Sequence, residues 1–598
     1  MAIGNGLISF TQLRRTAEVV REERCCHDDQ SEWENTFNRG LLLDIKAISD
    51  NDEVKLHLLL AVLEWQRLSM VHLNLAATFD SISEVIEKGG SDIVKKLISA
   101  NYTEVEFISL VDWLVQQVGA LASLAAANFG KDKRNRAIVN HTTKITIGSP
   151  AVLLDCLCLM SKEMPAGLSS SYFVVVALDD YLNYLKWNKD TVAYCCRFRA
   201  IISTSTKLKH LFHDFDKRRQ EQDREEMYRE IYSGSNYQRS REGSNNQRRR
   251  LVVRRENIIE DSLELLNFNS EDSLLNGIHI TFAGEEGEDA GGLTKEWISL
   301  LTQQLIGKVF QRGEDGADRM ELKPSCSFSD ANLMGVVLGL SLLLQIVIDV
   351  SLPRFLYRHL LSRSYCCTLD DLKQIRPTFA NGLAQIIDWQ EAGFSENLSM
   401  YFTCTSTLGT TVQLIKDGDI TPVTYSNRQM YVERVCQYVV IEQNKAQMDA
   451  LKSGFDHICQ DIPTLQLLSI DEFDSLIRGK EVSISLEFLK RLCKVECQVP
   501  NDDYLDQFWD VLAESKNPDI LKSLLHFVTA NHRVSISSEK DSIAFQIIIL
   551  QGSEFINRLP TASTCTNTLF LPRYPTKDLL RSRLLIALRQ GSVGFGLK

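Results

Sequence analysis

The sequence has no surplus of positive charge and little proline or glycine. Its 598 residues include 66 Lys and Arg against 78 Asp and Glu, which gives a formal net charge of −12. Proteins that wrap nucleic acid carry a basic surface, so we expect no nucleic-acid partner. The 12 prolines and 31 glycines are too few for a collagen-like or largely disordered chain. A chain of this length and ordinary apolar content forms several globular domains.

The sequence also lacks the patterns of a metal site and of a secreted protein. Its 15 cysteines are an odd number, with no C-x-x-C pair and no Cys/His cluster at zinc spacing. We therefore expect no metal, no cofactor and a reducing compartment, namely the cytoplasm with the nucleus as the alternative. The N-terminus places a short apolar stretch before its arginines, the reverse of a secretory signal, so we expect no such signal.

Long apolar runs are absent except for one. Residues 331–348 carry no formal charge, and their length reaches the lower limit for a membrane-spanning helix. Asn332, Ser341 and Gln345 are polar, however, and no basic cluster flanks the run closely, as the positive-inside rule prefers. We therefore predict a buried helix in a large core and no membrane span.

Helical periodicity dominates the first third of the chain. Leu56, Leu59, Leu60 and Leu63, for example, follow the i, i+3, i+4, i+7 spacing of one helix face. Such patterns predict an all-helical region over 1–232. This region either binds a partner or substrate, or serves as a structural module.

A Ser-, Gly- and Asn-rich stretch then predicts a linker over 233–250, after which the patterns become mixed α and β. Five arginines in RRRLVVRR, at 248–255, are interpretable as a nuclear address or a nucleic-acid patch. We favour a strand with exposed arginines at the start of the next domain. LNGIHITFAG, SIAFQIIIL and NTLFL predict further strands, and Thr576 predicts the N-cap of a last helix.

The most unusual string is GEEGEDAGGLTKEW, which occupies 284–297. It interleaves four glycines with Glu285, Glu286, Glu288 and Asp289. A phosphate-binding loop needs a G-K-[S/T] sequence and would be repelled by these carboxylates, and a calcium loop needs a D-x-D-x-D-G ladder. From residue chemistry alone we interpret the string as a turn between a strand and a helix.

Two further strings lie near the end of the chain. LPTASTCTNTLFLPRY places Cys565 in a short polar loop between strand-like runs. Backbone and hydroxyl donors in such a loop could stabilise a thiolate, whereas an exposed thiol without function is the simpler interpretation. In the terminal GFGLK, Phe595 is a bulky aromatic residue between two glycines. We expect its side chain to dock on the domain, either in a functional role or only to complete the hydrophobic core.

Together these strings resemble, in the family's order, the HECT domain, which is the catalytic unit of one class of ubiquitin-protein ligases. The resemblance runs from about residue 251 to residue 598. It is carried by FAGEEGEDAGGLTKEW, GVVLGLSLLLQIVIDVSLP, TLDDLKQIRP, ITPVTYSNRQMYV, LLHFVTANHRV, LPTASTC with NTLFLPRY, and GFGL. It implies a multidomain α+β protein, in which a helical N-terminal region precedes a bilobal domain.

The resemblance also implies how that domain is divided. A mostly helical N-lobe would cover 251–477, and an α/β C-lobe would cover 484–598. A sub-lobe between Thr368 and Phe455 would bind a ubiquitin-conjugating enzyme. RGKEVS, at 478–483, would be the hinge.

By the same resemblance Cys565 is the nucleophile, which would accept ubiquitin as a thioester and pass it to a substrate lysine. Phe595 matches the tail aromatic that assists the second transfer. The implied partners are ubiquitin, a conjugating enzyme and protein substrates. The chain departs from the family pattern at Ser563, where the family often has histidine, and at Thr566, where it often has phenylalanine.

These departures keep a second hypothesis open, a catalytically weak HECT-like scaffold. A third is a thiol hydrolase in which His526 or His532 acts as the base for Cys565. A hydrolase needs an imidazole close to the thiol, and no spacing in the sequence demonstrates one.

Overall fold

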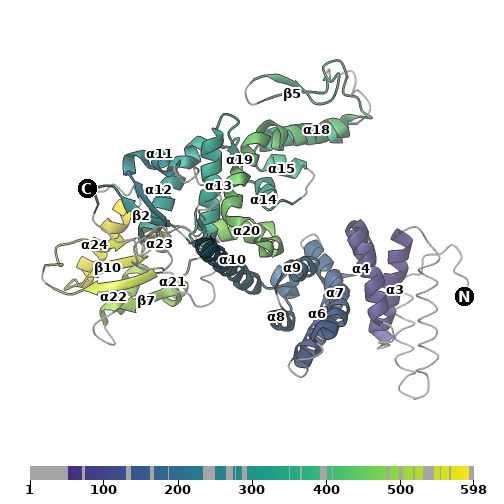
Figure 1. Ribbon diagram of the computed structural model, residues 1–598, viewed down its shortest axis with the longest axis horizontal. Coiled ribbons are helices and arrows are strands. Elements are labelled where there is room, and N and C mark those ends of the chain that lie inside the picture. Colours follow the sequence, from purple (N-terminus) through teal and green to yellow (C-terminus); the bar gives the residue numbers. More distant parts are fainter. Residues whose placement is uncertain are drawn as a thin grey trace, which may run out of the picture. The chain divides into compact units, whose positions relative to one another are not determined.

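The computed structural model describes residues 52–591 except 70–74, 130–135, 162–167, 186, 233–248, 264–273, 277, 286–291, 349, 364–366, 391–399, 407–408, 480–483, 497–502, 516–518, 530–544, 553 and 564–566. The chain forms two compact units (Figure 1). The first extends to Leu211 and includes Pro463–Ser469, and the second comprises Phe212–Ile462 and the chain from Ile470 onward. Most of the predicted linker, 233–250, and of the predicted hinge, 478–483, lies outside the described residues.

The described part of the first unit is helical, as its periodicity predicts. Its elements are α3 (Asp52–Ser69), α4 (Leu75–Val85), the π-helical turn η1 (Ile86–Gly90), α5 (Ser91–Asn101), α6 (Glu104–Phe129), α7 (Arg136–Met160), η3 (Ser170–Phe173), α8 (Val176–Asn183), α9 (Lys189–Cys196), η4 (Arg199–Ile201) and η9 (Pro463–Leu467). The long helix α10 (Thr204–Tyr232) begins in this unit and continues into the second.

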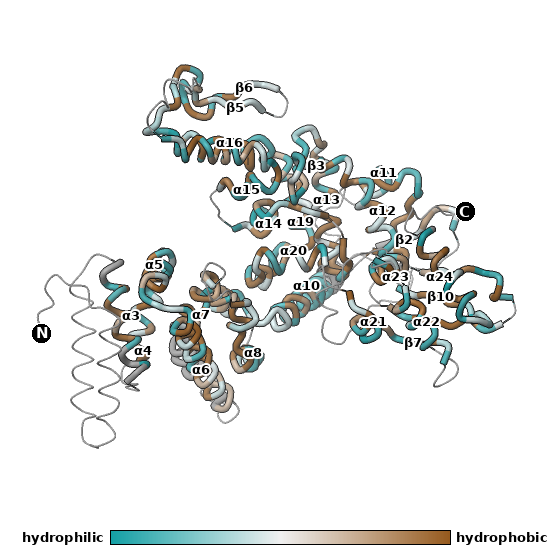
Figure 2. Tube along the Cα trace, turned by 180° about the vertical axis from the view of Figure 1, so that it is seen from behind, coloured by the Kyte–Doolittle hydropathy of each residue, from teal (hydrophilic) through white to brown (hydrophobic). Residues whose placement is uncertain are grey.

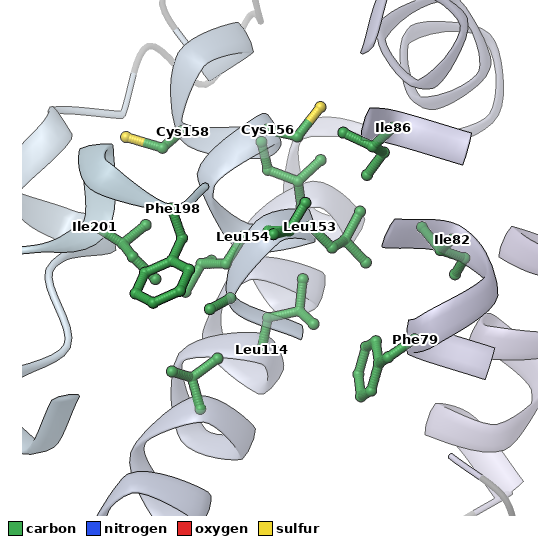
Figure 3. Packing of buried hydrophobic residues seen from close by; sticks show 14 of the residues in the cluster. Phe79, Ile82, Ile86, Leu114, Leu153, Leu154, Cys156, Cys158, Phe198 and Ile201 are labelled. Atoms are coloured by element: carbon green, nitrogen blue, oxygen red, sulfur yellow. The ribbon is translucent and has the colours of Figure 1, made fainter. Parts of the chain in front are cut away.

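One hydrophobic core holds these helices together. The four leucines that predict the helix near residue 56 are all at most 1% exposed in α3. Leu114 of α6 meets Leu153 and Leu154 of α7, with Phe79 of α4 and Phe198 nearby (Figure 3). Hydrophobic and hydrophilic residues are interspersed along the helices (Figure 2), and the buried core positions of this unit are apolar.

Two buried carboxylates in this unit are satisfied by specific donors. The side chain of Glu64 is fully buried and pairs with Arg67 at 2.8 Å. Asp155 of α7 accepts the backbone N–H of Ala200 at 2.5 Å. Burial nevertheless raises the pKa of Asp155 to about 6, because the charged form loses its hydration.

The helical part of the second unit is built around α13 and α19. Its helices and turns are η5 (Arg255–Asn257), α11 (Ile258–Ser262), η7 (Leu274–Asn276), α12 (Gly292–Val309), α13 (Phe328–Leu343), α14 (Arg354–Leu360), α15 (Leu369–Lys373), α16 (Pro377–Asp388), α18 (Arg428–Val440), η8 (Glu442–Asn444), α19 (Lys445–Cys459) and α20 (Ile470–Arg478). Two-stranded pairs join them, namely β1 (Arg249–Val253) with β2 (Ile278–Phe282), β3 (Phe310–Arg312) with β4 (Met320–Leu322), and β5 (Thr403–Thr405) with β6 (Thr411–Gln413).

Glycine allows α13 and α19 to touch backbone to backbone. A Cβ atom added at Gly335 would lie 1.9 Å from the carbonyl oxygen of Leu451, and one at Gly454 would lie 1.9 Å from that of Asn332. Every described α13 residue from Leu333 to Leu343 is buried. The apolar run is therefore a core helix, as predicted.

The helix ends earlier than the apolar run. Gln345 adopts a positive φ of 56°, and the N–H of Ile346 returns to the carbonyl of Ser341 at 2.8 Å. This is a Schellman C-cap, in which a left-handed residue closes the last turn. The prediction of one helix through 348 was wrong at this end, because hydrophobicity does not reveal where the backbone reverses.

The end of the chain forms an α/β region with its own core. Its sheet has the order β7-β8-β10-β9, in which β8 is parallel to β7 and β10, and β9 is antiparallel to β10. The elements are α21 (Leu486–Leu492), β7 (Cys493–Glu496), α22 (Asp503–Ala513), α23 (Ile520–Thr529), β8 (Phe545–Leu550), β9 (Thr561–Ser563), β10 (Thr568–Pro572) and α24 (Lys577–Gly591). Thr576 caps α24, as predicted, through its Oγ1, which accepts the N–H of Leu579 at 3.3 Å.

Among the described residues, α6 is long and apolar enough to cross a membrane, over Glu104–Ala127. A third of this apolar window is buried, including Leu110, Leu114 and Val118, and α6 packs on α7 and α8. The run around α13, which the sequence singles out, is too short a helix to span a membrane.

Candidate active site

The string that contains Cys565 forms a β-hairpin at the edge of the C-terminal sheet. β9 and β10 pair antiparallel, with Ser563 opposite Thr568. Residues 564–567 therefore connect the strands, and position 565 is the second of these four. Asn567 closes the connection with a φ of 50°, a left-handed conformation that asparagine tolerates better than most residues.

The stem of this hairpin is fixed to the rest of the sheet. The backbone N–H of Gln546 in β8 donates to the carbonyl of Asn567 at 2.9 Å, and its side-chain amide donates to Thr568 Oγ1 at 2.8 Å. At the other end of β10, the Tyr504 hydroxyl donates to the carbonyl of Pro572 at 2.6 Å and accepts the N–H of Tyr574. The β10 strand of the hairpin is therefore fixed at both ends.

The acidic and glycine-rich string lies at the beginning of α12, where it forms part of a charged cluster. Gly284 adopts a φ of 83° after β2. The Arg255 guanidinium lies 3.9 Å from the centre of the Phe282 ring and donates to Glu285 at 3.0 Å and to Glu296 at 2.7 Å. The hydrogen bond from Arg255 lowers the pKa of Glu285. The prediction of a turn between a strand and a helix is confirmed in the described part of the string, and two of its acidic side chains are neutralised by one arginine.

Lys295 joins the two strings. Its Nζ donates a hydrogen bond to the side-chain oxygen of Asn567, across 272 positions of sequence. The neighbours of Lys295 hold the helix in place: Thr294 Oγ1 donates to the carbonyl of Ile278 at 3.1 Å, and Trp297 Nε1 donates to Ser262 at 2.9 Å. Sequence reasoning missed Lys295, because nothing in a linear string shows which distant side chain it meets.

The residues predicted to carry the chemistry lie outside the described residues. These are Cys565 and Phe595, together with Thr566 and the alternative base His532. Ser563 ends β9 and is half-buried. The described arginines of RRRLVVRR belong to β1 and to the turn after it, as predicted. For example, Arg254 pairs with Asp261 at 2.6 Å.

The alternative base His526 is half-buried on α23, a helix that packs against β9. No group of three or more metal-ligating side chains occurs in the described part of the chain.

Large apolar side chains are exposed on the segment between Thr368 and Phe455. Trp389 is 36% exposed, Tyr401 47%, Ile420 72% and Met430 46%. Exposed aromatic side chains and methionine are enriched in protein-binding surfaces.

A family model described as the HECT-domain (ubiquitin-transferase) matches residues 299–598. The chain belongs to the HECT family. The match covers the chain from the middle of α12 onward, including the C-terminal sheet with its hairpin, so the resemblance to the HECT domain is confirmed. The matched part begins after β1, β2 and the acidic string.

Relatives of the HECT family with similar sequences bear ligase names. The probable E3 ubiquitin-protein ligase HECTD2 of Mus musculus is 30% identical over 366 residues, which cover 58% of this chain and 46% of the relative. The probable E3 ubiquitin-protein ligase HERC4 of Homo sapiens is 30% identical over 362 residues, 58% of this chain and 33% of the relative. The probable E3 ubiquitin-protein ligase mug30 of Schizosaccharomyces pombe is 25% identical over 503 residues, 78% of this chain and 60% of the relative. The chain thus spans about a third to three fifths of the length of these relatives.

Proposed function

We propose that this protein is a HECT-type ubiquitin-protein ligase, which accepts ubiquitin as a thioester on Cys565 and transfers it to a lysine of a protein substrate. Membership of the HECT family carries the proposal. The hairpin stem supports it, because a nucleophile that must meet two large proteins in turn needs a fixed base, and β10 is hydrogen-bonded to β8 beside the connection that contains Cys565.

The chemistry consists of two acyl transfers. The Cys565 thiolate attacks the carbonyl of the thioester between ubiquitin and the conjugating enzyme, and the cysteine of that enzyme leaves as a thiolate. A neutral substrate amine then attacks the new thioester on Cys565. The amine loses a proton, the Cys565 sulfur leaves and is reprotonated, and an isopeptide bond remains. Covalent catalysis of this kind divides one transfer into two, and neither step consumes ATP.

The second unit would work as two lobes. A helical N-lobe over 251–477 would bind the conjugating enzyme through the sub-lobe between Thr368 and Phe455, and a C-lobe over 484–598 would carry the hairpin. The exposed apolar side chains of the sub-lobe support the first assignment, and the separate core of the C-terminal sheet supports the second. Gly479 at the predicted hinge adopts a φ of 75°, which a glycine accommodates without strain. We place this activity in the cytoplasm, where cysteines remain reduced.

A charging assay tests this proposal. The full chain is incubated with ubiquitin-loaded conjugating enzyme, and the products are separated with and without reductant. We expect a reductant-labile ubiquitin adduct that Cys565→Ser abolishes. Cys493→Ser is the matched control, since Cys493 lies at the start of β7 in the same sheet and burial raises its pKa to about 12.

The other outcomes separate the alternatives. Absence of an adduct with every conjugating enzyme tested would favour the scaffold that Ser563 and Thr566 suggest. Release of ubiquitin without adduct or conjugates would favour the hydrolase, and His526→Ala would then stop it. In the same assay Phe595→Ala should leave the adduct intact and reduce the isopeptide product. Equal loss of both would contradict the role proposed for the tail.

A further inference from the structure

The hydrogen bond between Lys295 and Asn567 connects α12 to the hairpin of Cys565. Asn567 is two residues from Cys565 and is the last residue of the connection between β9 and β10. Lys295 lies in the first turn of α12, outside the sub-lobe proposed to bind the conjugating enzyme. The bond is partly shielded from solvent.

The residues on either side of Lys295, Thr294 and Glu296, are held by contacts with other elements. Arg255 forms ion pairs with Glu296, the residue after Lys295, and with Glu285. Thr294 is bonded to the β2 backbone, and this fixes the rotation of the helix at the residue before Lys295. The ammonium group of Lys295 donates to a neutral amide oxygen on another part of the domain.

We propose that Lys295 is a positioning residue for the second transfer, which holds the hairpin of Cys565 against α12 after the hairpin has left the conjugating enzyme. This inference rests on the function proposed above. A hairpin held at α12 is held outside the sub-lobe that would bind the conjugating enzyme. The bond would therefore favour the arrangement in which a substrate amine attacks, and it would contribute little to loading.

The physical basis is a single charge-assisted hydrogen bond in a hinged domain. Such a bond is stronger than one between neutral partners, and partial exclusion of water preserves its strength. A hinged lobe samples several orientations, so one bond of this strength shifts the population towards the orientation that contains it. Misplacement of a reacting atom by about 1 Å slows a transfer by up to about a hundredfold, so this shift affects the rate.

A single-turnover experiment separates the two transfers. The full chain is first charged with labelled ubiquitin, further charging is stopped, and loss of the adduct to free lysine is followed. We expect Lys295→Met to load within about twofold of the wild type and to discharge about tenfold more slowly. Lys295→Arg retains the charge and should restore most of the discharge rate. Lys308→Met is the matched control, since Lys308 lies near the other end of α12 in an exposed pair with Glu260.

A second variant tests the same bond from the other side. Asn567→Gly removes the amide oxygen and tolerates the positive φ, so it should reproduce the slow discharge. The double variant should discharge no more slowly than either single variant, because both remove one interaction. Discharge of Lys295→Met at the wild-type rate, or equal slowing of loading and discharge, would overturn the proposal.

Hydrogen exchange makes the inference testable apart from the ubiquitin chemistry. Without ubiquitin or conjugating enzyme, amides of β9 and β10 should exchange faster in Lys295→Met than in the wild type or in Lys308→Met. If the wild type forms no adduct, the proposed function fails, while the exchange result still decides whether Lys295 holds the hairpin. If Lys295→Met showed wild-type hydrogen exchange in β9 and β10 and also discharged ubiquitin at the wild-type rate, Lys295 would have no positioning role.

Discussion

The two units of this protein are both well packed, but they use different means of bringing helices together. In the first unit Leu114, Leu153 and Phe79 fill the space between helices. In the second, Gly335 and Gly454 remove side chains from the contact, so that the backbones of α13 and α19 touch. The first arrangement tolerates gradual change in side-chain volume, whereas the second allows none.

The units also differ in what their residues indicate about function. In the first unit the buried carboxylates of Glu64 and Asp155 have structural partners, and no string in it indicates a reaction. The second unit contains the acidic string, the hairpin and Lys295, which connects them. A well-packed core therefore shows that a segment is a domain. The candidate active site is indicated instead by a hydrogen bond between two sequence strings that lie far apart in the chain.

The largest effect should come from breaking the backbone contact in the second unit. Gly454→Ala places a methyl group 1.9 Å from the Asn332 carbonyl oxygen, so α13 and α19 must separate. We expect a loss of about 4 kcal/mol or more in the free energy of unfolding, because neither backbone can move out of the way. Urea denaturation of the full chain measures it.

Gly307→Ala is the control for this prediction. Gly307 lies in α12, and a Cβ atom there would meet nothing within 4 Å. Alanine should stabilise that helix by about 0.5–1 kcal/mol, because it loses less backbone entropy on folding. Similar losses in the two variants would show that glycine in a helix, and not the close approach, sets the cost.

A cavity in the first unit should weaken that unit without removing the chemistry of the second. Leu114 is fully buried, so Leu114→Ala should cost about 3 kcal/mol. Hydrogen exchange of α6 and α7 amides should show the loss, while the ubiquitin adduct still forms. Leu124→Ala, at a position 62% exposed on the same helix, should change little. Loss of the adduct in Leu114→Ala alone would mean that the first unit takes part in charging.

The smallest effect concerns the buried carboxyl of Asp155. Its pKa is about 6 in the folded protein against 3.8 for the ordinary group, so the folded state binds the proton more tightly. The first unit should therefore gain stability as the pH falls from about 7 to about 4, by on the order of 2 kcal/mol. Hydrogen exchange of α7 at several pH values measures this gain.

Asp155→Asn should flatten that dependence, because an amide does not titrate, and its oxygen can still accept the N–H of Ala200. Asp180→Asn, at an exposed position, should retain it. An unchanged pH dependence in Asp155→Asn would assign the effect to another group.

Local pattern predicted much of the secondary structure. Leucine spacing predicted the helix around Leu56, the strand around Arg249–Val253 follows RRRLVVRR, and Thr576 marked the beginning of α24. These predictions succeeded because the periodicity of a helix or strand and its caps depend on neighbouring residues. The end of α13 was missed, because a non-glycine residue with positive φ ends it inside an apolar run.

The sequence by itself determined the family, several of the helices and strands, and the identity of the thiol proposed to react, because each depends on residues close together in the chain. Only the tertiary structure decided that Gly335 and Gly454 meet backbone, that Arg255 neutralises Glu285 and Glu296, and that Lys295 reaches Asn567. The physical reason is distance along the chain. Contacts between residues far apart in sequence depend on how whole elements pack, and no local pattern encodes them.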